Sequence, residues 1–248
     1  MKRPWVLISG MAGLLLLPLI SQAATQYWDT ASSAGLQGGY GAWSTNDANW
    51  SDARTGTVLS AWTSGNAAHF VAPSNAAASV ITLADSLNVG SVTISGSPHT
   101  LIVTNGGQLL AGSAASVIGS ACANNTVVLA GGSSLWNLGG QTLTIGSGSS
   151  SATNNALRID GAGTAGGAMV TGVGTLYVGD LSSAADTRSL LTIANGGVLV
   201  VNNAPTIGDQ SGGNAVTVTG LGSLWAATSS VTLNLGAVST GGRSGNTL

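Results

Sequence analysis

Leu191-Thr-Ile-Ala-Asn-Gly-Gly197 repeats, in altered form, the string Leu101-Ile-Val-Thr-Asn-Gly-Gly107 from three repeats earlier. A shorter unit, an aliphatic residue followed by Gly and usually by Ser or Asp, returns along most of the chain. Its glycines are 29, 27, 33, 29 and 28 residues apart, at Gly90, Gly119, Gly146, Gly179, Gly208 and Gly236. Such a period indicates a solenoid, in which each repeat buries its apolar face only against its neighbours.

Each repeat divides into three short strands separated by turns, as in residues 215–219, 223–227 and 231–235. We therefore predict an all-β protein, a right-handed parallel β-helix of about six coils in which alternate side chains point inward. The predicted inward residues are Ile193, Val216, Val218, Val231, Leu233 and Leu235. The predicted outward residues are Thr217, Thr219 and Thr232.

Three asparagines fall at equivalent places just before a strand, at Asn125, Asn155 and Asn214. Asn tolerates left-handed backbone, and stacked amides can hydrogen-bond along a solenoid, so we expect a structural role in the turns.

Cys122 is the only cysteine, which excludes a disulfide within one chain. We interpret it as a small apolar core residue and not as a reactive thiol.

The N-terminus has the features of an export signal. Lys2 and Arg3 precede an apolar stretch over residues 6–20, and Ser21-Gln22-Ala23 supplies small residues before a cleavage site, so residues 1–23 are predicted to be removed. A membrane anchor is the weaker alternative, because the stretch is short and contains Pro18. The remainder has four Arg against eight Asp and no Lys, which excludes the basic patch that nucleic acids require.

Residues 24–80 form a Trp-rich head that precedes the repeats of residues 81–248. Its tryptophans are Trp28, Trp43, Trp50 and Trp62. Aromatic rings there can cover the exposed end of a β-helix, or they can stack on sugar rings. We favour the first interpretation, an N-terminal cap, because the open end of a solenoid exposes unpaired strands and apolar core.

Several of these strings resemble the repeats in the passenger regions of bacterial autotransporters and in autotransporter-associated β-strand repeat proteins. The resemblance covers roughly residues 85–240 and is strongest in Leu176-Tyr-Val-Gly-Asp180, Leu191–Leu199, Ile207-Gly-Asp209 and Asn214–Trp225. The head resembles the opening of such passengers in Trp28-Asp29, Gly41-Ala-Trp43, Asn49-Trp50 and Ala68-His-Phe70.

This resemblance implies an exported right-handed β-helix at, or released from, the surface of a Gram-negative bacterium, often an adhesin or an inert stalk. It implies as partner a host or environmental surface, glycan or protein. The family's translocator barrel is not evident before Arg243-Ser-Gly-Asn-Thr-Leu248. We therefore expect either a truncated passenger or export through a separate translocator.

No catalytic or metal-binding motif is found. His69 and His99 are isolated from each other and from any pair of cysteines, so we expect turn or surface residues, and no metal or cofactor. The glycines of Gly161-Ala-Gly163-Thr-Ala-Gly166 match a dinucleotide-binding fingerprint. The sequence after them continues the β pattern instead of opening a helix, which favours a corner turn.

Asp180 and Asp209 occupy the same repeat position and are expected on adjacent coils. Facing carboxylates can bind Ca²⁺ or act as an acid and base pair, although Gly-Asp is also a common turn. We predict a noncatalytic exported surface protein, which is either adhesive, with exposed faces of Thr, Ser and Asn that contact the partner, or purely structural. The alternative is a β-helix enzyme that acts on polysaccharide through Asp160, Asp180 or Asp209.

Overall fold

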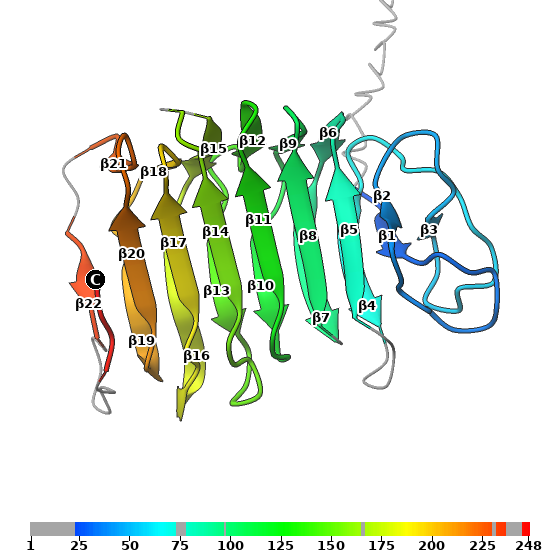
Figure 1. Ribbon diagram of the computed structural model, residues 1–248. Coiled ribbons are helices and arrows are strands. Elements are labelled where there is room, and N and C mark those ends of the chain that lie inside the picture. Colours follow the sequence, from blue (N-terminus) through cyan, green and yellow to red (C-terminus); the bar gives the residue numbers. More distant parts are fainter. Residues whose placement is uncertain (1–22, 73–77, 97, 165–166, 230–231, 237–244) are drawn as a thin grey trace, which may run out of the picture.

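The computed structural model describes residues 23–72, 78–96, 98–164, 167–229, 232–236 and 245–248, and it is a parallel β-helix (Figure 1). Three parallel sheets run side by side along the rod, and successive strands of the chain pass from one sheet to the next. In the described part of the chain no α-helix occurs, so none there could cross a bilayer. The predicted all-β class and coiled architecture are confirmed.

The first sheet has nine strands, in the order β22-β19-β16-β13-β10-β7-β4-β1-β3. From the N-terminus these are β1 (Thr25–Trp28), β3 (Trp50–Ser51), β4 (Ala67–Ala72), β7 (Ser91–Gly96), β10 (Ser116–Ser120), β13 (Leu143–Ser147), β16 (Leu176–Asp186), β19 (Thr206–Gly212) and β22 (Asn234–Leu235). All its pairs are parallel except β1 with β3, which belong to the head.

The second sheet has seven strands in chain order: β2 (Gly41–Ala42), β5 (Ser79–Leu83), β8 (His99–Thr104), β11 (Thr126–Ala130), β14 (Ala156–Asp160), β17 (Leu190–Ala194) and β20 (Ala215–Thr219). The third sheet has six: β6 (Ser86–Val89), β9 (Gln108–Ala111), β12 (Ser134–Asn137), β15 (Ala168–Val173), β18 (Val198–Val201) and β21 (Leu224–Ala227). Each coil between β6 and β21 therefore contributes one strand to each sheet.

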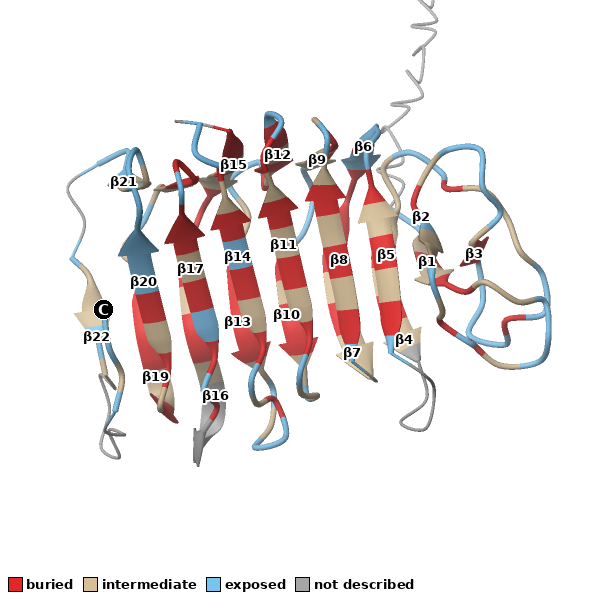
Figure 2. Cartoon of the chain, viewed as in Figure 1, coloured by how far each residue is buried: buried red, intermediate tan, exposed pale blue. Residues whose placement is uncertain are grey.

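Alternation along each strand builds the core, as Figure 2 shows for the strands nearest the viewer. In the second sheet one inward column runs in register through consecutive coils as Leu101, Val127, Leu157, Leu191 and Val216, all buried. Burying one such side chain stabilises the fold by about 1.5–3 kcal/mol. Columns of this kind stabilise the rod through burial, since Arg158–Asp160 is the one ion pair found among the described residues.

The repeated glycine leaves space for a side chain of the next coil at the corner that joins the first sheet to the second. Gly119 and Gly179 have φ of 79° and 77°, and a Cβ on either would lie within 2.4 Å of the Asn155 or Asn214 side chain of the next coil. The absent Cβ thus makes room for the asparagine. Gly146 and Gly208 stand equally close to Ser189 and Asn246.

The asparagines form the hydrogen-bonded row that the sequence predicts. Asn125 donates its backbone N–H to Asn155 Oδ1 at 3.1 Å, and the His99 N–H donates to Asn125 Oδ1 at 3.0 Å. Asn214 Oδ1 likewise accepts the Ser189 N–H at 2.9 Å. Cys122 was expected in the core, but it lies beside this row and is half-buried. Its Sγ accepts a hydrogen bond from Asn125 Nδ2 at 3.1 Å.

Ser189 interrupts this row, and we expect Ser189→Asn to stabilise the protein by about 1 kcal/mol. The Ser189 hydroxyl is buried without a partner, and among the described residues the Asn155 N–H finds no acceptor. An Asn at position 189 would offer Oδ1 to that N–H, as Asn155 does to Asn125, beside Gly146, which has no Cβ to obstruct it. Urea titration measures the gain. Ser189→Ala, which only removes the unpaired hydroxyl, is the control, and an equal result for both variants would contradict the explanation.

Two predictions about the repeats are wrong in detail. Val89-Gly90-Ser91 is not equivalent to the other glycine units: register places Ser95, not Gly90, beside Gly119. Val218 is predicted to be a core residue, yet it is 43% exposed, and Leu235 is 52% exposed. Both side chains point inward, as predicted, but they lie at the C-terminal end of the rod, where no described residue pairs with them on the far side. Val231 lies outside the described residues.

Candidate functional site

Asp180 and Asp209 are paired across adjacent coils, as predicted. They are directly in register between β16 and β19, both half-buried, and neither carboxylate has a hydrogen-bond or ion-pair partner among the described residues. Burial, and then repulsion by the Asp209 carboxylate, raise the pKa of Asp180 above its ordinary value. Chemically, the pair can share a proton or attract a cation.

The other residues of the enzymatic hypothesis lie elsewhere. Asp160 ends β14 in the second sheet, where it forms an ion pair with Arg158 and accepts hydrogen bonds from the Ala162 N–H at 3.0 Å and from Asn195 Nδ2 at 3.1 Å. Arg188, which could have neutralised the charges of Asp180 and Asp209, is exposed and forms no ion pair within the described ranges. The structure thus brings together Asp180 and Asp209 but not Asp160.

The nucleotide-like glycine string is a corner, as predicted. Residues 161–164 form the turn after β14, and the chain continues into β15, not into a helix. Ala165 and Gly166 lie outside the described residues. No helix N-terminus is available at this corner to bind a pyrophosphate.

The prediction that both histidines are turn or surface residues is wrong for His99. Its side chain is 1% exposed in β8, and neither ring nitrogen has a hydrogen-bond partner among the residues that the structure describes. His69 points outward from β4, half-buried, with its ring 5.6 Å from that of Tyr27. Within the described segments no three His, Cys, Asp or Glu side chains are grouped as metal ligands.

Acid should destabilise the protein through His99. Burial lowers the pKa of His99 from 6.5 to about 4. Below pH 6.5 His99 binds a proton in the unfolded chain but stays neutral in the folded chain. The contribution of neutral His99 to the free energy of unfolding is therefore full above pH 6.5, and it falls by about 3 kcal/mol as the pH approaches 4. Urea titrations at pH 7 and pH 4.5 measure this. In His99→Asn the loss should be smaller, and an unchanged loss would assign it to other groups.

The head tryptophans are buried, as a cap requires. Trp28, Trp43 and Trp50 are at most 1% exposed and Trp62 is 5% exposed. Trp43, Trp50 and Trp62 pack with ring centroids 4.7–5.0 Å apart. Rings shielded in this way have no face free for a sugar, so the sugar-platform alternative is not supported.

The second sheet presents an outward surface that extends over six successive coils. We call the outward side chains of β5, β8, β11, β14, β17 and β20 the front face, which Figure 2 shows toward the viewer. Its central row, in register, is Thr82, Ile102, Val128, Arg158, Thr192 and Thr217. The neighbouring row is Val80, Thr100, Thr126, Ala156, Leu190 and Ala215.

The front face is more apolar than the sequence led us to expect. Ile102, Val128 and Leu190 stand among the threonines, and Arg158 is the only charged residue in the two rows. The sequence Leu101-Ile-Val103 could have indicated this, because alternation along a strand places at least one of three successive aliphatic residues outward. Arg158 forms an ion pair with Asp160, which also points outward from β14 on this face.

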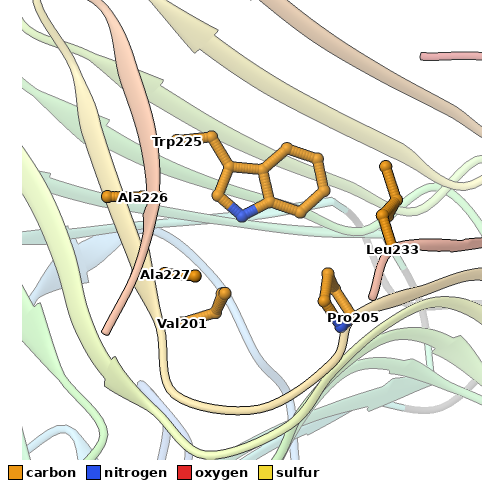
Figure 3. A pocket seen from close by; sticks show the side chains of 6 residues that line it. All are labelled: Val201, Pro205, Trp225, Ala226, Ala227 and Leu233. Carbon is orange, nitrogen blue, oxygen red and sulfur yellow. The ribbon is translucent and has the colours of Figure 1, made fainter. Parts of the chain in front are cut away.

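A pocket of about 170 Å³ opens at the C-terminal end of the third sheet (Figure 3). Trp225 forms one wall, opposite Pro205 and Leu233. Trp225 belongs to the same inward column as Trp136, through Val170 and Leu199. Trp136 has a paired strand on both sides, whereas Trp225 has one on a single side in the described part of the chain. The pocket is thus the unfilled end of the core.

Comparison with known proteins shows that the chain is similar in sequence to an autotransporter adhesin. No protein-family model matches the chain, and no solved structure matches it. The chain is 31% identical over 183 residues to the adhesin BmaC autotransporter of Brucella suis biovar 1 (strain 1330). The matched region covers 71% of this chain but only 5% of that adhesin. Over most of its length, the chain is therefore related in sequence to one short segment of an autotransporter adhesin.

Proposed function

We propose that the chain is a noncatalytic part of an exported, surface-displayed adhesin, and that its front face binds the partner. Similarity to an autotransporter adhesin supports export and display at a Gram-negative cell surface. The export signal predicted over residues 1–23 agrees with this, although residues 1–22 lie outside the described part of the chain.

The front face is the single observation that carries the proposal. Its rows are fixed by parallel pairing in neighbouring coils, about 4.8 Å apart, so a binding surface exists before the partner arrives. Thr and Val lose little side-chain entropy on contact, unlike Lys or Arg. Hydroxyls beside aliphatic groups suit an uncharged glycan or a protein surface, whereas a phosphate-rich partner requires basic side chains.

Two double variants test the assignment. Ile102→Glu with Thr192→Glu places charges on β8 and β17 of the front face, whereas Thr93→Glu with Tyr177→Glu places them on β7 and β16 of the first sheet. In each pair two strands lie between the altered ones. We expect the front-face variant to lose binding to cultured epithelial cells on the order of tenfold, through desolvation of its charges, and the control to bind as wild type.

Other results of this binding experiment would point to a different surface or a different function. Equal binding by both variants would place the adhesive surface elsewhere, and no binding by the wild type would leave a structural spacer. The register of Asp180 with Asp209 favours one further candidate, cleavage of polysaccharide. Release of reducing ends from a glycan panel by the wild type, abolished in Asp180→Asn, would replace adhesion by catalysis.

A further inference from the structure

Two Asn-Gly turns occupy the same place in the β-helix, three repeats apart. Asn105-Gly106 follows β8, and Asn195-Gly196 follows β17. The two asparagines share a left-handed backbone, with φ of 52° and 50°, and both side chains are exposed. The turns are thus a matched pair within one molecule.

Their surroundings differ. Asn195 Nδ2 donates to Asp160 Oδ1 at 3.1 Å, and the N–H of the buried Gly196 donates to Ser223 Oγ at 3.1 Å. The Asn195 carbonyl also accepts the Gly163 N–H at 2.8 Å. In contrast, neither the Asn105 side chain nor the Gly106 N–H has a hydrogen-bond partner among the described residues.

These groups are the reactants of a known type of intramolecular chemistry. The backbone nitrogen of the residue after an Asn can lose its proton and attack Cγ, and Gly permits this attack best because it has no side chain. A bond forms between that nitrogen and Cγ, the Cγ–Nδ2 bond breaks, and ammonia leaves, which gives a cyclic imide. Water then opens either imide carbonyl to yield aspartate or isoaspartate, with no change of oxidation state.

We propose that Asn105 is a site of spontaneous deamidation, and that the hydrogen bonds of Asp160 and Ser223 protect the equivalent Asn195. The product places a negative charge on the corner between β8 and β9. Isoaspartate also lengthens the backbone there by one carbon. A Cβ on Gly106 would already lie 3.1 Å from the Gly132 carbonyl oxygen, so the lengthened turn has little room.

Mass spectrometry of the purified chain tests the proposal. The protein is incubated in mildly alkaline buffer, denatured and digested with trypsin, which cleaves after Arg54, Arg158, Arg188 and Arg243. Asn105 is then found in peptide 55–158 and Asn195 in peptide 189–243, and fragmentation locates the modified residue. We expect Asn105 to convert on the order of tenfold faster, since two hydrogen bonds must break before Asn195 can react.

Variants separate the two halves of the proposal. Ser223→Ala frees the Gly196 N–H, and Asp160→Ala frees the Asn195 amide, so each should accelerate conversion of Asn195 in chains that still melt cooperatively. Asn105→Gln should abolish the signal from the first turn. Equal rates at the two sites, or conversion of Asn105 only after unfolding in urea, would overturn the proposed site. Unchanged Asn195 rates in both variants would overturn the proposed protection.

Discussion

Ile193→Asp is expected to lower the free energy of unfolding by about 4 kcal/mol or more, which is enough to prevent folding of a marginally stable chain. Ile193 is completely buried in β17, in register with Ile159 on one side and Val218 on the other. The arginines that the structure describes, Arg54, Arg158 and Arg188, are all exposed, so none of them can pair with a carboxylate in the buried core. Urea titration followed by circular dichroism measures the loss.

Val218→Asp and Thr217→Asp complete the series. Val218 occupies the same inward column but is 43% exposed, so its aspartate stays hydrated and should cost only about 1 kcal/mol. Thr217 points outward and its replacement should change stability by less than about 0.5 kcal/mol. If Val218→Asp and Ile193→Asp were equally damaging, a further coil would have to cover Val218.

Gly179→Ala is expected to destabilise the protein by roughly 3–5 kcal/mol, although it adds only one methyl group. Gly179 has a φ of 77°, which strains any residue with a Cβ. The new methyl carbon would also lie 2.4 Å from Asn214 Oδ1 and Nδ2, which are fixed by the buried hydrogen bonds of the corner row. Thermal melting and urea titration measure the effect.

Gly112→Ala is the matched control for this substitution. No atom lies within 4 Å of a Cβ built on Gly112, and its φ is not positive. The variant should therefore be as stable as the wild type, or slightly more stable, because Ala restricts the unfolded chain. A mild effect of Gly179→Ala would mean that the corner can shift, and the Gly–Asn contact would then not fix the spacing of the coils.

The sequence was sufficient for most of the fold because its signals are local and recur in every coil. The glycine period placed Asp180 beside Asp209 on adjacent coils. The repeat pattern did not predict burial correctly at the C-terminal end of the rod. Val218 carries the pattern of a core residue, but burial depends on the following coil, which no pattern within the strand can reveal.

The candidate site was less predictable than the fold. His99 could not be recognised as buried, because the corner row it occupies is otherwise built from Asn and Ser, residues typical of turns. The front face was expected to be polar, since outward threonines are frequent in the sequence. Its apolar character arises only when register aligns Ile102 with Val128 across coils.

The Gly–Asn corner has a consequence for how such a chain changes over generations. At two of these corners a glycine of one coil meets an asparagine of the next coil, as Gly119 does with Asn155 and Gly179 with Asn214, whereas Gly146 meets Ser189. Unequal recombination between similar repeats would delete or duplicate both partners together. The gene can therefore lengthen or shorten the rod by whole coils while the Gly–Asn contact between neighbouring coils is kept, so the length of the rod can vary while its fold is retained.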